Sequence, residues 1–253
     1  MKRTKPIKLL GFDIIPAGLD EATSIIAHYL NRKEGNYFCL VDMNLAVQGN
    51  KSLLVKKALN DATANFPDSM GIKLALHLSG IHFNGRSRGA DLMLRICEYA
   101  EKNKIKIFLY GNKKSTIKLL CKAIRGRYPN ITIAGFICPP FRELSEEEKI
   151  VIINKIKCLS PDIIFVSLGA PKQEIWMMEH KDEIDAIKIG VGAAFDFIAG
   201  VIKPAPFWMR EIGLEWLYRF FQQPNKVFKR IVLIPYFIFL IIKNIIEKNN
   251  FGN

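Results

Sequence analysis

The chain has 253 residues, 49% of them hydrophobic, and a net charge of +13 from 37 Lys and Arg against 24 Asp and Glu. This composition excludes a disordered or collagen-like chain and predicts one globular domain with an appendage. The positive charge is typical of a protein with an anionic partner, such as nucleic acid, phosphorylated ligands or an acidic membrane surface, and a merely lysine-rich solvated surface is the alternative. Nucleic acid is not expected, because the sequence has no basic, aromatic stripe on a known nucleic-acid-binding module.

The predicted elements begin with a strand or hairpin over 7–15, a helix over 19–33, a strand over 37–41, and helices at about 50–60 and 70–79. After residue 89, helices over 90–103, 115–127, 145 onward and 171–180 alternate with strands over 105–110, 131–134, 162–168 and 187–191. Repeated strand–Gly–helix units predict an α/β fold, a Rossmann-like, mostly parallel sheet with helices on both faces. We assign this core to residues 1–202 and a C-terminal helical appendage to 203–253.

The predicted appendage is basic and aromatic. Residues 203–253 hold eight Lys and Arg against three Glu, a charge of +5. The apolar run 231–242 has 12 residues, whereas a spanning helix needs about 20, so it is either a buried core helix or a segment lying on a membrane. Docking on anionic lipid headgroups is the favoured interpretation. The alternative is a helical pair that packs on the sheet with its cations reaching solvent.

Two further features bear on the compartment. Five cysteines are spread along the chain without a CxxC pair, which predicts reduced, buried thiols and argues against a disulfide framework or a zinc ribbon. The first six residues precede no apolar signal-peptide core. Both observations favour a cytoplasmic setting.

Polar residues gather where the predicted strands end. In parallel sheets, ligands bind beyond the carboxyl ends of the strands. These turns are 42–44, 111–115, 169–174 and 192–196. Gly111-Asn112-Lys113 opens a helix, so its N–H groups and Lys113 can hold a phosphate, although the Walker A pattern is missing and an ordinary turn is the alternative. The segment Gly190-Val191-Gly192 lacks the third glycine of a dinucleotide-binding fingerprint, so NAD binding is only weakly indicated.

Two acids stand out from their surroundings. Asp68 lies in the turn-rich loop 66–71, where spacing alone favours a helix N-cap and a general base is the alternative. Asp196 sits among apolar residues and needs a partner, which predicts that it fixes a turn through backbone N–H groups. The sequence has no HxxxH or HExxH pair, and it lacks the DxD motif with which many nucleotide-sugar transferases hold a divalent ion on the diphosphate. We therefore expect neither metal nor cofactor. In a transferase of that kind, Arg, Lys and backbone N–H groups would neutralise the leaving diphosphate.

Residues 161–174, PDIIFVSLGAPKQE, resemble the signature of the WecG/TagA/CpsF glycosyltransferases, glycosyltransferase family 26. Four other motifs keep the order of that family. They are FPDSMG at 66–71, RSRGADLM at 86–93, VGAAFDF at 191–197 and GLEWLYR at 213–219. The resemblance covers about residues 10–230, and five ordered motifs are hard to reconcile with chance.

The resemblance implies an inverting, metal-independent hexosyltransferase at the cytoplasmic membrane face. It would move a sugar from a UDP-sugar (N-acetylmannosamine-, glucose- or uronic-acid-type) to a polyprenyl-diphosphate-linked sugar, in cell-surface polysaccharide or teichoic acid synthesis. The residue matching the family's proposed general base is Asp68. The turns after the strands and the family motifs together predict the substrate-binding residues. They are Asp42, Asn44, Arg86, Asp91, Gly111, Asn112, Lys113, Lys172, Gln173, Glu174, Gly192, Asp196, Arg210, Arg219 and Lys226.

Three positions depart from the family pattern. Asp42 stands where the family usually has Thr, so this carboxylate can compete with Asp68 as base or contact a different sugar hydroxyl. Pro204 and Lys226 stand where the family has Arg, and lysine lacks the bidentate fork. The alternatives are a nucleotide-dependent oxidoreductase and a non-catalytic, membrane-docked partner of a polysaccharide assembly complex. A homo-oligomer is compatible with either.

Overall fold

The centre of the molecule is a six-stranded sheet in which all neighbouring strands are parallel. A computed structural model describes residues 5–30, 32, 34–206, 208–209, 213–222 and 224–250. The order is β4-β3-β8-β7-β5-β6, with β3 Tyr37–Val41, β4 Ala64–Pro67, β5 Lys106–Gly111, β6 Thr132–Ile137, β7 Ile163–Ser167 and β8 Ile187–Gly190. A separate antiparallel hairpin joins β1 (Ile7–Leu9) to β2 (Phe12–Ile14). The predicted α/β class and parallel sheet are confirmed.

The strands read as continuous apolar runs because helices cover both faces of the sheet. In β5, Phe108 and Tyr110 join the core on one face, whereas Ile107 and Leu109 join the core on the other. This alternation is the period of two that a strand imposes. Each face therefore has a hydrophobic core of its own.

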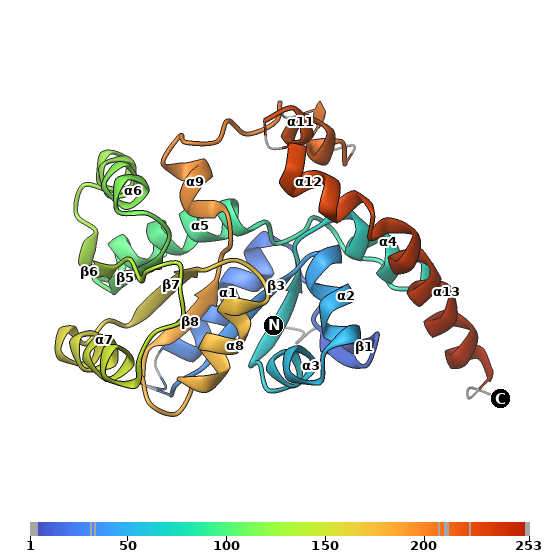
Figure 1. Cartoon of the computed structure of the whole chain (residues 1–253), viewed down its shortest axis with the longest axis horizontal. Helices are drawn as coiled ribbons and strands as arrows, with labels where there is room; N and C mark the ends of the chain where they lie inside the picture. The colour runs from blue at the N-terminus through green and yellow to red at the C-terminus, as the bar shows by residue number, and fades with distance from the viewer. Residues whose placement is uncertain are drawn as a thin grey trace.

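The helices divide between the two cores (Figure 1). The first core takes residues from α2 Met43–Lys51, α3 Leu53–Asn60, α4 Met70–Leu78, α7 Glu146–Leu159 and α8 Lys172–Glu179. The second takes residues from α1 Leu19–Leu30, α5 Gly89–Lys102, α6 Lys114–Arg127 and α9 Ala194–Ile198. The predicted start of α7 is confirmed by a capping box, in which Ser145 and Glu148 each bind the other's backbone N–H.

Beyond residue 203, the described part of the chain includes the helices α11 Glu215–Gln222, α12 Pro224–Ile231 and α13 Ile234–Asn250. Figure 1 shows α11 and α12 at the α9 side of the sheet and α13 leading from them to the C-terminal end of the chain. α13 contacts α2 and buries Phe237, Leu240 and Ile241, so the core-helix interpretation of the apolar run is confirmed for one face. Phe239, on the other face, is 57% exposed. Among the described residues, none of the helices combines the length and apolar character needed to cross a bilayer.

Short elements escaped the sequence analysis. The sequence predicts a loop over 66–71, but Phe66 and Pro67 end β4 and α4 begins at Met70, so only Asp68 and Ser69 connect them. The helix expected at about 50–60 is divided at Ser52, whose hydroxyl accepts the Val55 N–H and starts α3. Four residues ending in proline carry too little periodicity to predict a strand.

The prediction of free thiols is confirmed, but the prediction that they are buried is wrong for Cys158, which is exposed, and for Cys121 and Cys138, which are half-buried. All five cysteines lie in the described part of the chain and all are free thiols. Cys39 and Cys97 are buried in the two cores.

Candidate active site

The predicted site residues form a row along the carboxyl edge of the sheet. Asp68 follows β4, Asp42 follows β3, Gly192 comes two residues after β8, and Asn112 follows β5. The backbone N–H of Asp68 donates to the carbonyl of Val41 at 3.0 Å, which ties the first two turns together. Because β3 lies between β4 and β8, Asp42 stands in the row between Asp68 and the Gly192 turn.

Asp68 does not cap α4, the helix that follows it, which corrects the role that spacing favoured. Ser69 caps α4 instead, through its hydroxyl and the Ile72 N–H. Oδ1 of Asp68 accepts the backbone N–H of Gly89, at the start of α5, at 3.0 Å. One carboxylate oxygen thus links two segments that lie 21 residues apart in the sequence.

The surroundings of Asp68 tune its acidity. Burial raises its pKa from 3.8 to about 6, and the charges of Asp42 and Glu215 act in the same direction. The Gly89 N–H and Arg86 lower it in part. A carboxylate with a pKa near 6 is ionised at neutral pH and is a stronger base than an ordinary aspartate, which suits a group that removes a proton from a hydroxyl.

Asp42 has both carboxylate oxygens engaged. Oδ1 caps α2 by accepting the Leu45 N–H at 2.8 Å, and Oδ2 lies 3.5 Å from Nη1 of Arg230 in α12. These contacts favour a structural and electrostatic role for Asp42 over that of a competing base. Its neighbour Asn44 accepts a hydrogen bond from Nε2 of Gln48 at 3.3 Å.

Gln173 and Glu174 lie in the first turn of α8 and are buried. Nε2 of Gln173 donates to Oε1 of Glu174 at 2.8 Å, and Oε1 of Gln173 accepts the Gly192 N–H at 3.2 Å. Burial raises the pKa of Glu174 to about 7; the Gln173 hydrogen bond lowers it in part, and Asp42 raises it. Their neighbour Lys172 is exposed.

The turn after β5 is joined to the turn after β8. Nδ2 of Asn112 donates to Oδ1 of Asp196 at 3.1 Å, so the partner of Asp196 is an amide side chain, which corrects the predicted backbone N–H partners. Gly111 has φ +110°, and a Cβ there would lie 2.4 Å from the Ser167 carbonyl oxygen. The N–H groups of Asn112 and Lys113 are already engaged, by the Ser167 carbonyl and by Oδ1 of Asn112. The Lys113 side chain is exposed, so phosphate binding here stays a prediction that rests on that side chain and the first turn of α6.

The loop before α5 brings cations to the same edge. The N–H of Ser87 donates to the Pro67 carbonyl at 2.9 Å, which places Arg86 near enough to lower the pKa of Asp68. Arg88 and Asp91 form an ion pair at the start of α5. Asp91 is therefore a partner of this cationic loop.

The site residues in the predicted appendage, 203–253, fall into two groups: those predicted from the sequence and those found only in the structure. Arg210 lies outside the described residues, and the Arg219 and Lys226 side chains do so as well, although their backbones belong to α11 and α12. Glu215, in the predicted GLEWLYR motif, and Arg230 were not singled out from sequence. They are recognised only in the structure, where the charge of Glu215 acts on Asp68 and Arg230 lies beside Asp42.

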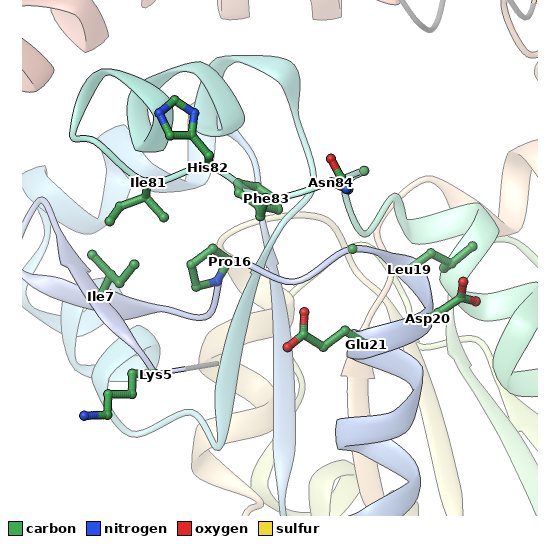
Figure 2. A pocket seen from close by; sticks show the side chains of 12 residues that line it. Lys5, Ile7, Pro16, Leu19, Asp20, Glu21, Ile81, His82, Phe83 and Asn84 are labelled. Atoms are coloured by element: carbon green, nitrogen blue, oxygen red, sulfur yellow. The ribbon is translucent and has the colours of Figure 1, made fainter. Parts of the chain in front are cut away.

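A separate hollow of about 790 Å³ lies beside this edge, between α1 and the segment 81–85 (Figure 2). Figure 2 shows Pro16 and Phe83 among the residues that line it, together with Asp20 and Glu21 on α1. None of the predicted site residues lines it. Two acids against Lys5 make it a poor place for a diphosphate, so we locate the site at the carboxyl edge.

The edge combines a tuned carboxylate with cations and structured turns. In the part of the chain that the structure describes, His, Cys, Asp and Glu side chains form no group of three suited to hold a metal ion. The chemistry that these residues themselves offer is proton removal by Asp68 beside positively charged side chains.

The sequence model of the Glycosyl transferase WecG/TagA/CpsF family matches residues 7–251. The chain belongs to this family. A protein of Bacillus subtilis (strain 168), named N-acetylglucosaminyldiphosphoundecaprenol N-acetyl-beta-D-mannosaminyltransferase, is 32% identical over 223 residues, which are 88% of this chain and 84% of that protein. Proteins of the same name from Bacillus spizizenii and Staphylococcus aureus (strain MW2) are 27% and 29% identical over 96% and 95% of this chain, and over 92% and 93% of their own lengths.

Membership of the family confirms the resemblance seen in the motifs and makes the chain a glycosyltransferase. The oxidoreductase alternative is thereby set aside. Because the match runs to residue 251, it includes α11, α12 and α13 as well as the sheet.

Proposed function

We propose that this WecG/TagA/CpsF glycosyltransferase moves a sugar from a UDP-sugar to a polyprenyl-diphosphate-linked sugar, with inversion and without a metal. The three relatives above carry names in which an N-acetyl-β-D-mannosaminyl group goes to N-acetylglucosaminyldiphosphoundecaprenol. We therefore place N-acetylmannosamine first among the donor sugars, ahead of glucose and uronic acids. The pathway would be synthesis of teichoic acid or another cell-surface polysaccharide.

The reaction is a single displacement. Asp68 removes the proton of the acceptor hydroxyl, the hydroxyl oxygen bonds to the anomeric carbon, and the bond from that carbon to the UDP oxygen breaks. The electron pair leaves with UDP, whose added charge is met by cations such as Arg86 and by N–H groups at the turns. Attack opposite to the leaving group inverts the anomeric centre.

The observation that carries this proposal is the state of Asp68. A carboxylate held by the Gly89 N–H at 3.0 Å, with its pKa raised to about 6, is poised to take a proton at neutral pH. Asp42, the alternative base, has one oxygen in a cap and the other beside Arg230. Asp68 is therefore our choice for the base.

The test is a screen of UDP-sugars against a synthetic polyprenyl-diphosphate N-acetylglucosamine, with UDP release as the signal. We expect Asp68→Asn to fold and to bind UDP, but to transfer sugar about 10²–10⁴-fold more slowly. Transfer by this variant at the wild-type rate would remove Asp68 from the role. No UDP release from wild type with any lipid-linked acceptor would favour the non-catalytic alternative. Activity lost with a chelator and restored by manganese would contradict the metal-free mechanism.

We also propose that α12 and α13 hold the enzyme at the cytoplasmic membrane face. Ile238, Phe239 and Ile242 are each about half exposed on the side of α13 opposite to its buried residues. Apolar side chains on a basic appendage suit an anionic bilayer surface.

The membrane proposal is best tested in the full chain, because removing α13 would expose the hydrophobic surface that its buried residues cover. Phe239→Glu with Ile242→Glu should reduce co-sedimentation with vesicles containing phosphatidylglycerol, while transfer to a water-soluble short-chain acceptor stays unchanged. Leu119→Glu, at a 49% exposed site on α6 and so outside the predicted appendage, is the matched control. Equal pelleting of the double variant and wild type would defeat the proposal.

A further inference from the structure

The carboxyl group of Glu174 is the least satisfied acid in the neighbourhood of the site. The residue has no exposed surface, and its Oε2 has no hydrogen-bond partner. Its Oε1 accepts the amide of Gln173 at 2.8 Å. A buried carboxyl group with an unsatisfied oxygen destabilises the folded state, so its presence calls for a role beyond packing.

The carboxyl group fixes the orientation of the Gln173 amide. An amide side chain donates through its nitrogen and accepts through its oxygen. Because Nε2 points to Glu174, Oε1 is turned to the Gly192 N–H, 3.2 Å away. Gly190 gives this amide its place, since a Cβ there would lie 2.9 Å from Nε2.

The turn that Gln173 holds lies against the segment that orients Asp68. A Cβ on Gly89 would be 2.7 Å from the carbonyl oxygen of Val191, the residue before Gly192. The N–H of the same Gly89 donates to Oδ1 of Asp68 at 3.0 Å. A displaced Val191–Gly192 turn would therefore displace this donor.

We propose that Glu174 is a positioning residue for Asp68, acting through the Gln173 amide, the Val191–Gly192 turn and the Gly89 N–H. The inference rests on the proposed function, in which Asp68 is the base. Nothing in this chain of contacts requires Glu174 to touch substrate. It requires only an acceptor oxygen at the place of Oε1.

Several charged groups face the two acids and stay unchanged in the experiment. Asp42 and Glu215 raise the pKa of Asp68, and Arg86 lowers it. Asp42 also faces Glu174. A change in the titration of Asp68 caused by substitution at Glu174 would therefore report a change in the Gly89 hydrogen bond.

The experiment compares Glu174→Leu, which removes the acceptor, with Glu174→Gln, which keeps a carbonyl oxygen. For Glu174→Leu we expect kcat to fall about tenfold with the donor KM within about twofold, because base orientation rather than donor binding is lost. We expect the pKa of Asp68 to rise by roughly half a unit, because a hydrogen bond to its ionised form is weakened. Glu174→Gln should keep the pKa of Asp68 at its wild-type value, because its side-chain oxygen can still accept the Gln173 amide. Glu179→Leu, at the exposed end of α8, is the matched control.

The pKa of Asp68 is followed by NMR of its carboxyl carbon in the substrate-free full-length protein, so this readout does not depend on transfer. An inactive wild type would refute the proposed function, while the titration still decides the positioning role. An unshifted Asp68 in Glu174→Leu would overturn the inference, and so would an equal shift in Glu174→Gln. If Glu174→Leu lacks a cooperative thermal transition, Gln173→Met breaks the same link and must give the same shift.

Discussion

The two ends of the parallel sheet each bury an ionisable side chain, and they treat it differently. At the amino end, Nζ of Lys188 in β8 donates to the carbonyls of Ile184 at 2.7 Å and Ala186 at 3.1 Å. At the carboxyl end, one oxygen of the buried Glu174 has no partner. The contrast separates a charge bonded to the backbone, which serves the fold, from an incompletely bonded acid beside the proposed active site.

The pKa values at the two ends move in opposite directions for one reason. Burial disfavours the charged form, so it lowers the pKa of Lys188 to about 7 and raises the pKa of Asp68 to about 6. Asp185 and Asp182 offset part of the effect at Lys188. Four experiments test whether the two ends differ in this way.

The largest effect is expected in the pH profile of the carboxyl end. Protonated Asp68 cannot accept a proton, so kcat/KM should fall about tenfold per pH unit below a pH of about 6. In Asp68→Asn the residual rate should lack this acidic limb. A wild-type kcat/KM that stays constant down to pH 5 would contradict the assignment.

Substitution of Lys188 at the amino end should change the stability of the protein and leave its catalysis unchanged. The pKa of Lys188 is lower in the folded state than its ordinary 10.5, so the unfolded chain binds more protons between about pH 7 and 10.5. The free energy of unfolding of wild type should therefore rise with pH in this window, by on the order of 3 kcal/mol relative to Lys188→Met. Urea denaturation at pH 7 and pH 10 measures the difference. Lys106→Met, at an exposed amino-end position of β5, is the control.

The effect of Glu174 on stability should have the opposite pH dependence, and it should appear in the acidic range. Its pKa is raised from 4.5 to about 7, so the folded state binds more protons than the unfolded state in that window and wild-type stability falls as pH rises. Glu174→Gln, which cannot titrate, should gain on the order of 1–3 kcal/mol relative to wild type between pH 4.5 and pH 7. Denaturation curves at the two pH values test this. A constant difference would mean that Glu174 titrates normally.

The smallest effect is expected at the rim, where Asp42 faces Arg230. Their side chains are 23% and 44% exposed, so the pair is worth less than about 1 kcal/mol and is screened by salt. Asp42→Asn and Arg230→Gln should each raise the acceptor KM about two- to fivefold at low salt, and the double variant should do no worse than either. Lys243→Gln, which breaks a pair within α13, is the control. Additive losses would show that the two side chains act independently.

Much of the fold could be predicted because local patterns repeat. Continuous apolar runs at 105–110 and 162–168 predicted β5 and β7, and the acidic first turn after Ser145 predicted α7. β4 and α9, with four and five residues, are too short for a periodicity to show. The division between α2 and α3 depends on a single capping serine, which the pattern of apolar residues does not mark.

The candidate site was predictable where it lies in contiguous motifs. Asp68, Gln173 and Asn112 were found because turns after strands and the family motifs contain them. Arg230 and Glu215 were not, since their partners Asp42 and Asp68 are more than 140 residues away in the sequence. The N-cap assigned to Asp68 failed because Ser69, one residue later, fills that place.

By itself, the sequence determined the layered α/β architecture, the family and the carboxylate proposed to act as base, since periodicity, turn chemistry and motifs are written along the chain. Only the tertiary structure decided which turns become neighbours, because the strand order β4-β3-β8-β7-β5-β6 is not the order of the chain. It also decided the acidity of Asp68, because burial and the nearby charges that raise its pKa come from segments far apart in sequence.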